Sequence, residues 1–295
     1  MPKDICRLQF VKMHGIGNDY IYIDNIKEKF PCFVSEESLS HLSRTISDRH
    51  FGIGSDGLIM ILPSEIADFR MRIFNADGSE AQMCGNGIRC VAKYVYEKNM
   101  TKKTTLQIET LAGIKEILLF VKDRKVESIR VDMSVPILEP CRIPVIGEKT
   151  GDFYNKNIKV KDKTFNITMI GMGNPHCVIF TEVLSDELIN TYGPLIENLS
   201  IFPEKTNVEF VKIKDRKHIE MRVWERGSQE TLACGTGACA ASVASRLNGF
   251  IENNVEVKLK GGYLKIEIDE NNQHVFMTGG ADFIAEGIYF YEVDI

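Results

Sequence analysis

Alternating apolar and polar positions recur through most of the chain and predict a series of short strands. A period of two is typical of strands that bury one face of a sheet. In the first half the pattern covers 21–24, 58–62, 69–74, 106–110 and 117–121. In the second half it covers 165–169, 178–180, 208–214, 218–224, 255–260 and 263–268. The pattern therefore predicts a protein rich in β-sheet.

Helical spacing of apolar residues appears after two glycine-rich turns. GNGIRCVAKYVYEKN follows Cys84, and GTGACAASVASRLNG follows Cys234. Each stretch has the three-to-four-residue period of an amphipathic helix. Asn248-Gly249 supplies a C-terminal stop for the second helix. Strands and helices alternate along the chain, so the fold class is α/β (α+β).

The two glycine-rich turns belong to an internal repeat. Residues 71–90 read MRIFNADGSEAQMCGNGIRC, and 150 positions later residues 221–240 read MRVWERGSQETLACGTGACA. Upstream, GIGND at 15–19 matches GMGNP at 171–175 in the same order. Repeats of this kind indicate a duplicated domain.

The duplication and the proline spacing predict two domains. We expect the first to span 1–134 and the second 135–281, with the crossover in the proline-spaced run 135–144. A final strand at about 282–295 is expected to return to the first domain.

Composition narrows the class of protein. The net charge is -5 and the pI is about 5.8, which argues against a nucleic-acid surface. No window reaches the roughly 18 apolar residues of a membrane span, and no apolar signal segment opens the chain. We therefore expect a cytoplasmic protein that binds neither nucleic acid nor membrane.

Eight cysteines are too few for a disulfide scaffold in a chain of 295 residues. Six of them are interpreted as packing residues: Cys6, Cys32, Cys90, Cys141, Cys177 and Cys239. Cys84 and Cys234 differ, because each precedes a glycine-rich turn that opens a helix. Unpaired N–H groups and the helix dipole there favour a thiolate and also bind an anion. Two such turns at one cleft could hold a carboxylate with a sulfur on each side of its α-carbon, an arrangement that suits inversion by proton transfer.

Two other kinds of site fit the sequence less well. A zinc site from Cys84/Cys90 and Cys234/Cys239 would need cysteines on one helix face, and these spacings do not provide it. A dinucleotide site at GIGSDG, residues 52–57, would need a helix next, whereas a strand pattern follows. We therefore expect no metal.

Taken together, these segments resemble the diaminopimelate epimerase family. The matching segments are KMHGIGNDY (12–20), FNADGSE (74–80), MCGNGIRC (83–90), GNPHCVIF (173–180) and WERGSQETLACGTGACA (224–240). The resemblance implies two pseudo-symmetric domains, each a curved sheet or barrel around a central helix. It also implies interconversion of LL- and meso-2,6-diaminopimelate in lysine and peptidoglycan-precursor biosynthesis, without pyridoxal or another cofactor.

The resemblance assigns roles to particular residues. Cys84 and Cys234 become the acid–base pair, and His176 and Glu225 match residues that help set the protonation of the thiols. The residues implied to contact the substrate are Asn18, Asn75, Gly85, Asn86, Asn174, Asn207, Glu225, Arg226, Gly235 and Thr236.

Two positions depart from the family pattern, and two other functions stay open. Gly57 stands where many members carry Gln, and Gln229 stands where Gly is commoner. The alternatives are a proline or hydroxyproline racemase, and a thiol-redox binding protein that uses the cysteines as a disulfide switch. The sequence does not fix the oligomeric state; a homodimer is the assembly considered.

Overall fold

The computed structural model describes residues 4–26, 35–146 and 154–293, which fall into two compact units. The first unit comprises the described residues up to Val131 together with those from Gly280 onward. The second runs from Asp132 to Gly279. The chain thus leaves the first unit after Val131 and returns to it at Gly280. The proline-spaced run 135–144 lies within the second unit, where Ile137 bridges Gly171.

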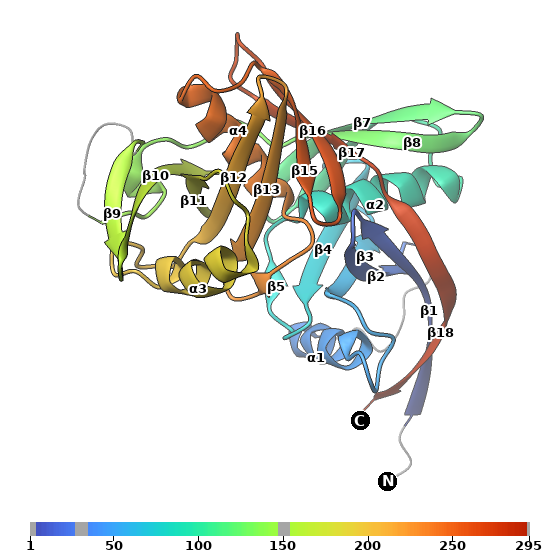
Figure 1. Cartoon of the computed structure of the whole chain (residues 1–295). Helices are drawn as coiled ribbons and strands as arrows, with labels where there is room; N and C mark the ends of the chain where they lie inside the picture. The colour runs from blue at the N-terminus through green and yellow to red at the C-terminus, as the bar shows by residue number, and fades with distance from the viewer. Residues whose placement is uncertain (1–3, 27–34, 147–153, 294–295) are drawn as a thin grey trace. The chain divides into compact units, whose positions relative to one another are not determined.

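The first unit holds a mixed sheet and two helices, α1 (Glu36–Ser47) and α2 (Gly85–Glu97). Its strands are β1 (Asp4–Gly15), β2 (Asn18–Asp24), β3 (Gly57–Leu62), β4 (Phe69–Asn75), β5 (Glu80–Ala81), β6 (Thr105–Thr110), β7 (Gly113–Lys122), β8 (Lys125–Asp132) and β18 (Asp282–Val293). The pairing order is β18-β1-β2-β3-β4-β6-β7-β8, with β5 also on β4. The long strands β1 and β18 lie side by side in Figure 1.

The second unit repeats this plan with helices α3 (Asp186–Glu197) and α4 (Gly235–Leu247). Its strands are β9 (Lys156–Val160), β10 (Lys163–Gly171), β11 (Pro175–Phe180), β12 (Asn207–Asp215), β13 (His218–Glu225), β14 (Gln229–Glu230), β15 (Asn254–Leu259), β16 (Gly262–Ile268) and β17 (Val275–Gly279). The pairing order is β9-β10-β11-β12-β13-β15-β16-β17, with β14 also on β13.

The two pairing orders are equivalent strand by strand. The parallel pairs β2–β3 and β4–β6 of the first unit correspond to β11–β12 and β13–β15 of the second. All other pairs in the two orders are antiparallel. A match of order and direction over a whole sheet confirms that the chain is an internal duplication.

In each unit, one helix lies against each face of the sheet. α1 buries Leu39, Leu42 and Ile46 against β1, β2 and β3. α3 buries Ile189, Tyr192 and Ile196 against the equivalent strands β10, β11 and β12. α2 and α4 pack on the opposite side, and α4 contacts the strands from β10 to β13 and from β15 to β17. Strands β3 and β11 are consequently buried on both faces. The α+β fold with a curved sheet around a central helix is confirmed.

The sequence pattern missed α1 and α3. Each helix begins at a serine N-cap that accepts from the backbone N–H three residues on, Ser35 for α1 and Ser185 for α3. Acidic residues fill both first turns, as the helix dipole favours. These capping signals were present in the sequence, although Pro194 inside α3 weakens the helical pattern there. None of the helices in the described residues is both long and apolar enough to cross a membrane.

Candidate active site

Cys84 is the N-cap of α2 and stands where the chain turns from β5 into the helix. Its backbone is extended (φ -136°), and its sulfur accepts from the Gly87 N–H at 3.4 Å. The thiol donates to Asn18 Oδ1 at 3.5 Å. Cys84 is only partly buried. The predicted turn, with a sulfur beside the N–H groups that open a helix, is therefore present.

A network of amides and buried charges holds this first turn. Asn18 Oδ1 also accepts from Asn86 at 3.3 Å, and Asn18 Nδ2 donates to Asp56 at 2.8 Å. The fully buried Arg89 donates to Gly85 O at 3.0 Å and to Asn86 Oδ1 at 2.9 Å. Asn18 and Asn86 are thus brought to the sulfur. Asp56 and Arg89, which hold these two asparagines in place, were not predicted from the sequence.

The first unit places Asn75 at the end of β4, where the residue begins a turn. Its side-chain amide donates to Ser79 Oγ at 3.0 Å, and its N–H donates to Ser79 O at 2.8 Å. These contacts orient the side chain within its own turn, and none of the hydrogen bonds just given links it to Cys84.

Cys234 is the N-cap of α4 and repeats the geometry of Cys84. Its backbone is extended (φ -114°), and its sulfur accepts from the Gly237 N–H at 3.3 Å. Thr236 Oγ1 lies 3.5 Å from the sulfur. Cys234 is only 5% exposed, so this sulfur is more enclosed than Cys84. Gly235 and Thr236 supply the first N–H groups of α4, as Gly85 and Asn86 do for α2.

Carboxylates surround the second sulfur. Glu225, the last residue of β13, accepts from the Thr231 hydroxyl and also bonds the Cys234 thiol. Burial raises the pKa of Glu225, and the nearby Glu209 adds to that rise. The pKa of the Cys234 thiol is raised well above its usual value, first by burial and then by Glu225 and Glu209. Cys234 is therefore a protonated thiol at neutral pH.

This result corrects the expectation that the helix N-terminus makes both cysteines acidic. The Gly237 N–H does act in that direction on Cys234, as does Thr236. Loss of solvation and two neighbouring carboxylates outweigh it, because a thiolate is the charged form that burial disfavours. The Cys234 sulfur does lie at the N-terminus of a helix, as predicted, but the helix dipole does not decide whether the thiol is protonated.

His176 lies in β11 at the centre of a buried chain of polar groups. Nδ1 is 2.7 Å from Glu209 Oε1, and Nε2 is 2.8 Å from Asn174 Oδ1. His176 and Glu209 are both fully buried. Glu209 was not predicted from the sequence, where it is the polar position between Val208 and Phe210 in a strand whose first five residues are all buried.

Asn207 and Arg226 meet beside this chain. Asn207 Nδ2 donates to Pro175 O at 2.9 Å, and Asn207 Oδ1 accepts from the Arg226 N–H at 2.9 Å. The Arg226 side chain is exposed and donates to Glu204 O at 3.0 Å. Asn207 is therefore a buried anchor for the Arg226 backbone, and the guanidinium is accessible to solvent.

Gly57 and Gln229, the two positions that depart from the family pattern, both lie where the backbone restricts which side chain fits. A Cβ added to Gly57 would lie 2.2 Å from the backbone oxygen of Phe74, so this backbone excludes any side chain there. Gln229 has φ +63°, a left-handed conformation that glycine adopts more easily. The conformation explains a preference for Gly at position 229.

The remaining cysteines divide by burial. Cys90, Cys177 and Cys239 are buried, and burial raises the pKa of Cys90 to about 12. Cys6 is partly buried. The prediction was wrong for Cys141, which is exposed in the short 3-10 turn Pro140–Arg142. Cys32 lies outside the described residues.

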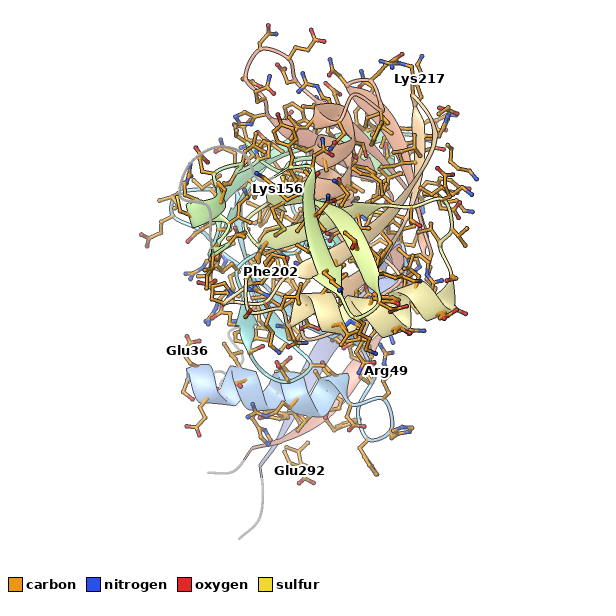
Figure 2. All side chains as sticks on the ribbon, turned by 60° about the vertical axis from the view of Figure 1, so that its left-hand side comes forward. Glu36, Arg49, Lys156, Phe202, Lys217 and Glu292 are labelled. Atoms are coloured by element: carbon orange, nitrogen blue, oxygen red, sulfur yellow. The ribbon has the colours of Figure 1, made fainter. Side chains whose placement is uncertain are left out.

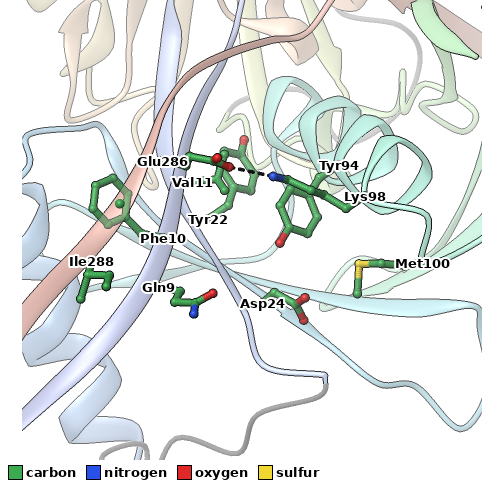
Figure 3. A pocket seen from close by; sticks show the side chains of 11 residues that line it. Gln9, Phe10, Val11, Tyr22, Asp24, Tyr94, Lys98, Met100, Glu286 and Ile288 are labelled. Carbon is green, nitrogen blue, oxygen red and sulfur yellow. Dashed lines mark hydrogen bonds and ion pairs between the residues drawn. The ribbon is translucent and has the colours of Figure 1, made fainter.

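A cavity of about 490 Å³ opens in the first unit away from Cys84. It lies among β1, β2, β18 and the C-terminal part of α2, and the Lys98–Glu286 ion pair (2.7 Å) is part of its wall (Figure 3). Tyr22 lines it and donates to Gly87 O at 3.5 Å. Tyr22 thus connects the wall of this cavity to the cysteine turn, whose own residues are not among those that line the cavity.

The family model for diaminopimelate epimerase matches residues 10–138 and 168–284. A diaminopimelate epimerase of Methanococcus maripaludis is 51% identical over 98% of this chain and 100% of its own length. One from Acetivibrio thermocellus is also 51% identical, over 98% of this chain and 99% of its own.

Solved structures of lower identity share the fold. A hydroxyproline epimerase from Agrobacterium vitis superposes with a TM-score of 0.72 at 14% identity, covering 99% of this chain and 93% of its own. A phenazine biosynthesis protein of Bacillus anthracis superposes with a TM-score of 0.65 at 16% identity, covering 96% and 99%. At such identities the likeness concerns the fold alone. The family match and the full-length relatives show that the chain belongs to the diaminopimelate epimerase family.

Proposed function

We propose that this protein interconverts LL- and meso-2,6-diaminopimelate in lysine and peptidoglycan-precursor biosynthesis, with Cys84 and Cys234 as the acid–base pair. The observation that carries the proposal is the pair of equivalent cysteine N-caps, one in each half of the duplicated fold. Membership of the family and 51% identity to diaminopimelate epimerases support the substrate. The protein is thus an isomerase that acts on a small amino acid.

The carboxylate next to the reacting carbon is the group that the two helix N-termini would hold. The N–H groups of Gly85, Asn86, Gly235 and Thr236 open α2 and α4, where backbone donors have no partner within the helix. Donors fixed in place stabilise the negative charge that develops as the α-proton leaves. Exclusion of water from the site would strengthen this effect.

The environments of the two sulfurs suggest which one starts as the acid. Burial, Glu225 and Glu209 hold Cys234 as a thiol, ready to donate a proton. The repeat offset places neutral Asn75 and Ile59 where the second half has Glu225 and Glu209. We propose that Cys84, whose thiol donates to Asn18 Oδ1 in the structure, is the sulfur that is deprotonated first and then removes the α-proton in one direction of the reaction. The roles reverse in the other direction, because each turnover leaves the proton on the opposite sulfur.

The far end of the substrate carries a second ammonium and carboxylate. Arg226 has an exposed guanidinium on a backbone anchored by Asn207, and an arginine can bind a carboxylate through two parallel hydrogen bonds. Glu225 is engaged with Thr231 and the Cys234 thiol. We therefore assign Arg226 to the distal carboxylate and Glu225 chiefly to the thiol. Asn18, Asn75 and Asn174 supply further polar contacts, and Asn207 acts through the Arg226 backbone that it anchors.

The proposal is tested by assaying purified, reduced protein with LL-diaminopimelate and, in parallel, with L-proline and trans-4-hydroxy-L-proline. We expect formation of the meso isomer and no inversion of either proline. Inversion of a proline without turnover of diaminopimelate would replace this function by that of a proline racemase. Activity that rises on oxidation of the cysteines would favour the thiol-redox alternative.

We further propose a homodimer and a cytoplasmic location. β18 carries the exposed apolar side chains Phe283, Ile284, Ile288 and Phe290, a strip that a second copy could cover. Sedimentation of wild type against Phe290→Lys tests the dimer.

The cytoplasmic location is proposed because a reducing compartment suits an enzyme that needs two free thiols.

A further inference from the structure

Glu209 is a buried carboxylate whose contacts go beyond its effect on the Cys234 thiol. It lies in β12, is fully buried, and accepts from His176 Nδ1 through Oε1 at 2.7 Å. Its other oxygen, Oε2, is buried and has no hydrogen-bond partner among the described residues. A carboxylate loses its solvation by water on burial, so one that stays charged needs a compensating charge nearby.

The first half of the fold shows that the position does not need an acid. The equivalent of Glu209 by the 150-residue offset is Ile59, which is also fully buried. A Cβ on Gly87 would meet Ile59 Cδ1 at 2.5 Å, and one on Gly237 would meet Glu209 Oε1 at 2.8 Å. Both side chains pack behind the turn that follows a cysteine. Packing alone is satisfied by isoleucine, so the carboxylate has an electrostatic role.

The hydrogen bonds of His176 indicate what that role is. Nδ1 faces a Glu209 oxygen and Nε2 faces Asn174 Oδ1 at 2.8 Å, so both ring nitrogens point at acceptors. A ring that donates from both nitrogens is an imidazolium. The Glu209 carboxylate is the adjacent group placed to balance such a charge on His176.

The state of His176 in turn orients Asn174. This asparagine lies in the loop between β10 and β11 and is partly exposed. An amide has one acceptor and one donor group. With Oδ1 turned to the imidazolium, the NH2 group of Asn174 is directed away from His176. A neutral ring with a bare Nε2 would instead favour the flipped amide, with its NH2 on the ring and its oxygen outward.

We propose that Glu209 is a positioning residue: it keeps His176 doubly protonated, and His176 fixes Asn174 with its NH2 group available to a substrate carboxylate. The proposal rests on the proposed function, because the substrate contact of Asn174 is part of it. Asn174 is the group that touches the substrate, and Glu209 acts on it through His176.

The first test is the protonation of His176 in the wild-type protein, followed by NMR with 15N-labelled histidine. We expect two protonated ring nitrogens at neutral pH, with the signal assigned by its loss in His176→Asn. A single protonated nitrogen would overturn the proposal, and this readout needs no variant at Glu209 and no turnover. A wild type that fails to epimerise diaminopimelate would instead overturn the proposed function.

The second test compares Glu209→Gln with Glu220→Gln, which removes an equal charge from the surface of the same unit, where Glu220 pairs with Lys258. Gln keeps the shape and an acceptor but not the charge. We expect Glu209→Gln to leave one protonated nitrogen on His176 and to raise KM for diaminopimelate about 10- to 100-fold, more than it lowers kcat, the scale of a misplaced substrate contact. Glu220→Gln should change neither. An unchanged KM in Glu209→Gln would contradict the proposal.

Discussion

The two cysteine turns share a backbone but differ in the side chains behind them. In both, the cysteine is an extended N-cap whose sulfur accepts from the N–H of a glycine three residues on, at 3.4 Å for Cys84 and 3.3 Å for Cys234. Behind the first turn lie asparagine amides and Ile59, and behind the second lie Glu225, Glu209 and His176. Duplication has preserved the position of the sulfur and changed the side chains around it.

The comparison explains how a near-symmetric scaffold can carry an asymmetric reaction. Inversion requires one base and one acid in each direction, so two identical thiols would have to be set apart by the substrate alone. Here the second half already holds its thiol protonated through burial and two carboxylates. In the proposed two-thiol reaction, this difference between the halves determines which sulfur starts as the acid.

Elsewhere the halves have kept the same polar contacts. Arg72 pairs with Glu80 (2.7 Å) and with Glu36 at the start of α1, as Arg222 pairs with Glu230 (2.6 Å) and with Asp186 at the start of α3. Figure 2 shows Glu36 and Arg49 at opposite ends of α1. Each arginine links β4 or β13 to the outer helix of its unit. The scaffold is conserved between the halves where it holds the helices, and it diverges at the sulfurs.

The largest effect on stability is expected when the second-half acid is placed in the first half. Ile59→Glu buries a carboxylate without the histidine that accompanies Glu209, because the matching residue of the first half is Tyr20. An uncompensated buried charge costs about 3–5 kcal/mol. Urea unfolding would measure it, with Ile59→Val as a control that costs about 0.5–1.5 kcal/mol. Equal losses for the two variants would show that the halves tolerate charge alike.

A smaller but more specific effect is expected in the reactivity of the two thiols. The thiolate is the species that iodoacetamide alkylates. Because the pKa of Cys234 is raised, its thiolate forms only above the usual thiol range, and its alkylation should keep increasing with pH beyond about 8.5. At neutral pH we expect the less buried Cys84 to react about tenfold faster than Cys234. Peptide mass spectrometry resolves the two sites, and faster alkylation of Cys234 would reverse our assignment of base and acid.

The smallest effect concerns the shared scaffold. Arg72→Lys and Arg222→Lys keep the charge but lose the paired hydrogen bonds to the two carboxylates. We expect each to lower the free energy of unfolding by about 1 kcal/mol, in the range of partly exposed ion pairs. The two losses should agree within about 0.5 kcal/mol. Thermal unfolding of the two variants measures this, and a loss confined to one half would contradict the equivalence of the two networks.

The strands and the two cysteine turns could be predicted from the sequence, whereas the groups that surround the cysteines could not. Alternation predicted strands such as β4 and β13, and the 150-residue repeat predicted both cysteine turns together with α2 and α4. Helices α1 and α3 were missed because their signals lie in caps, while the search followed apolar periodicity. The duplication was readable because glycines and cysteines at tight turns tolerate few replacements.

The protonation of Cys234 could not be read from sequence. It depends on Glu209 and Glu225, which lie 25 and 9 residues away along the chain and meet only because β12 and β13 pair. Glu209 looked like the polar member of an ordinary alternating strand, but β12 is buried on both faces at that point. Burial of this kind is a property of the folded sheet.

The central claim is that both cysteines are required for inversion, and separate Cys84→Ser and Cys234→Ser variants in deuterated water test it most directly. With LL-diaminopimelate, wild type should form the meso isomer with solvent deuterium at the inverted carbon. Each variant should lose about 10²- to 10⁴-fold in rate, the scale of a missing general acid or base, whereas Cys141→Ser at an exposed position should not. Near-native inversion by either Cys84→Ser or Cys234→Ser would contradict the two-thiol account.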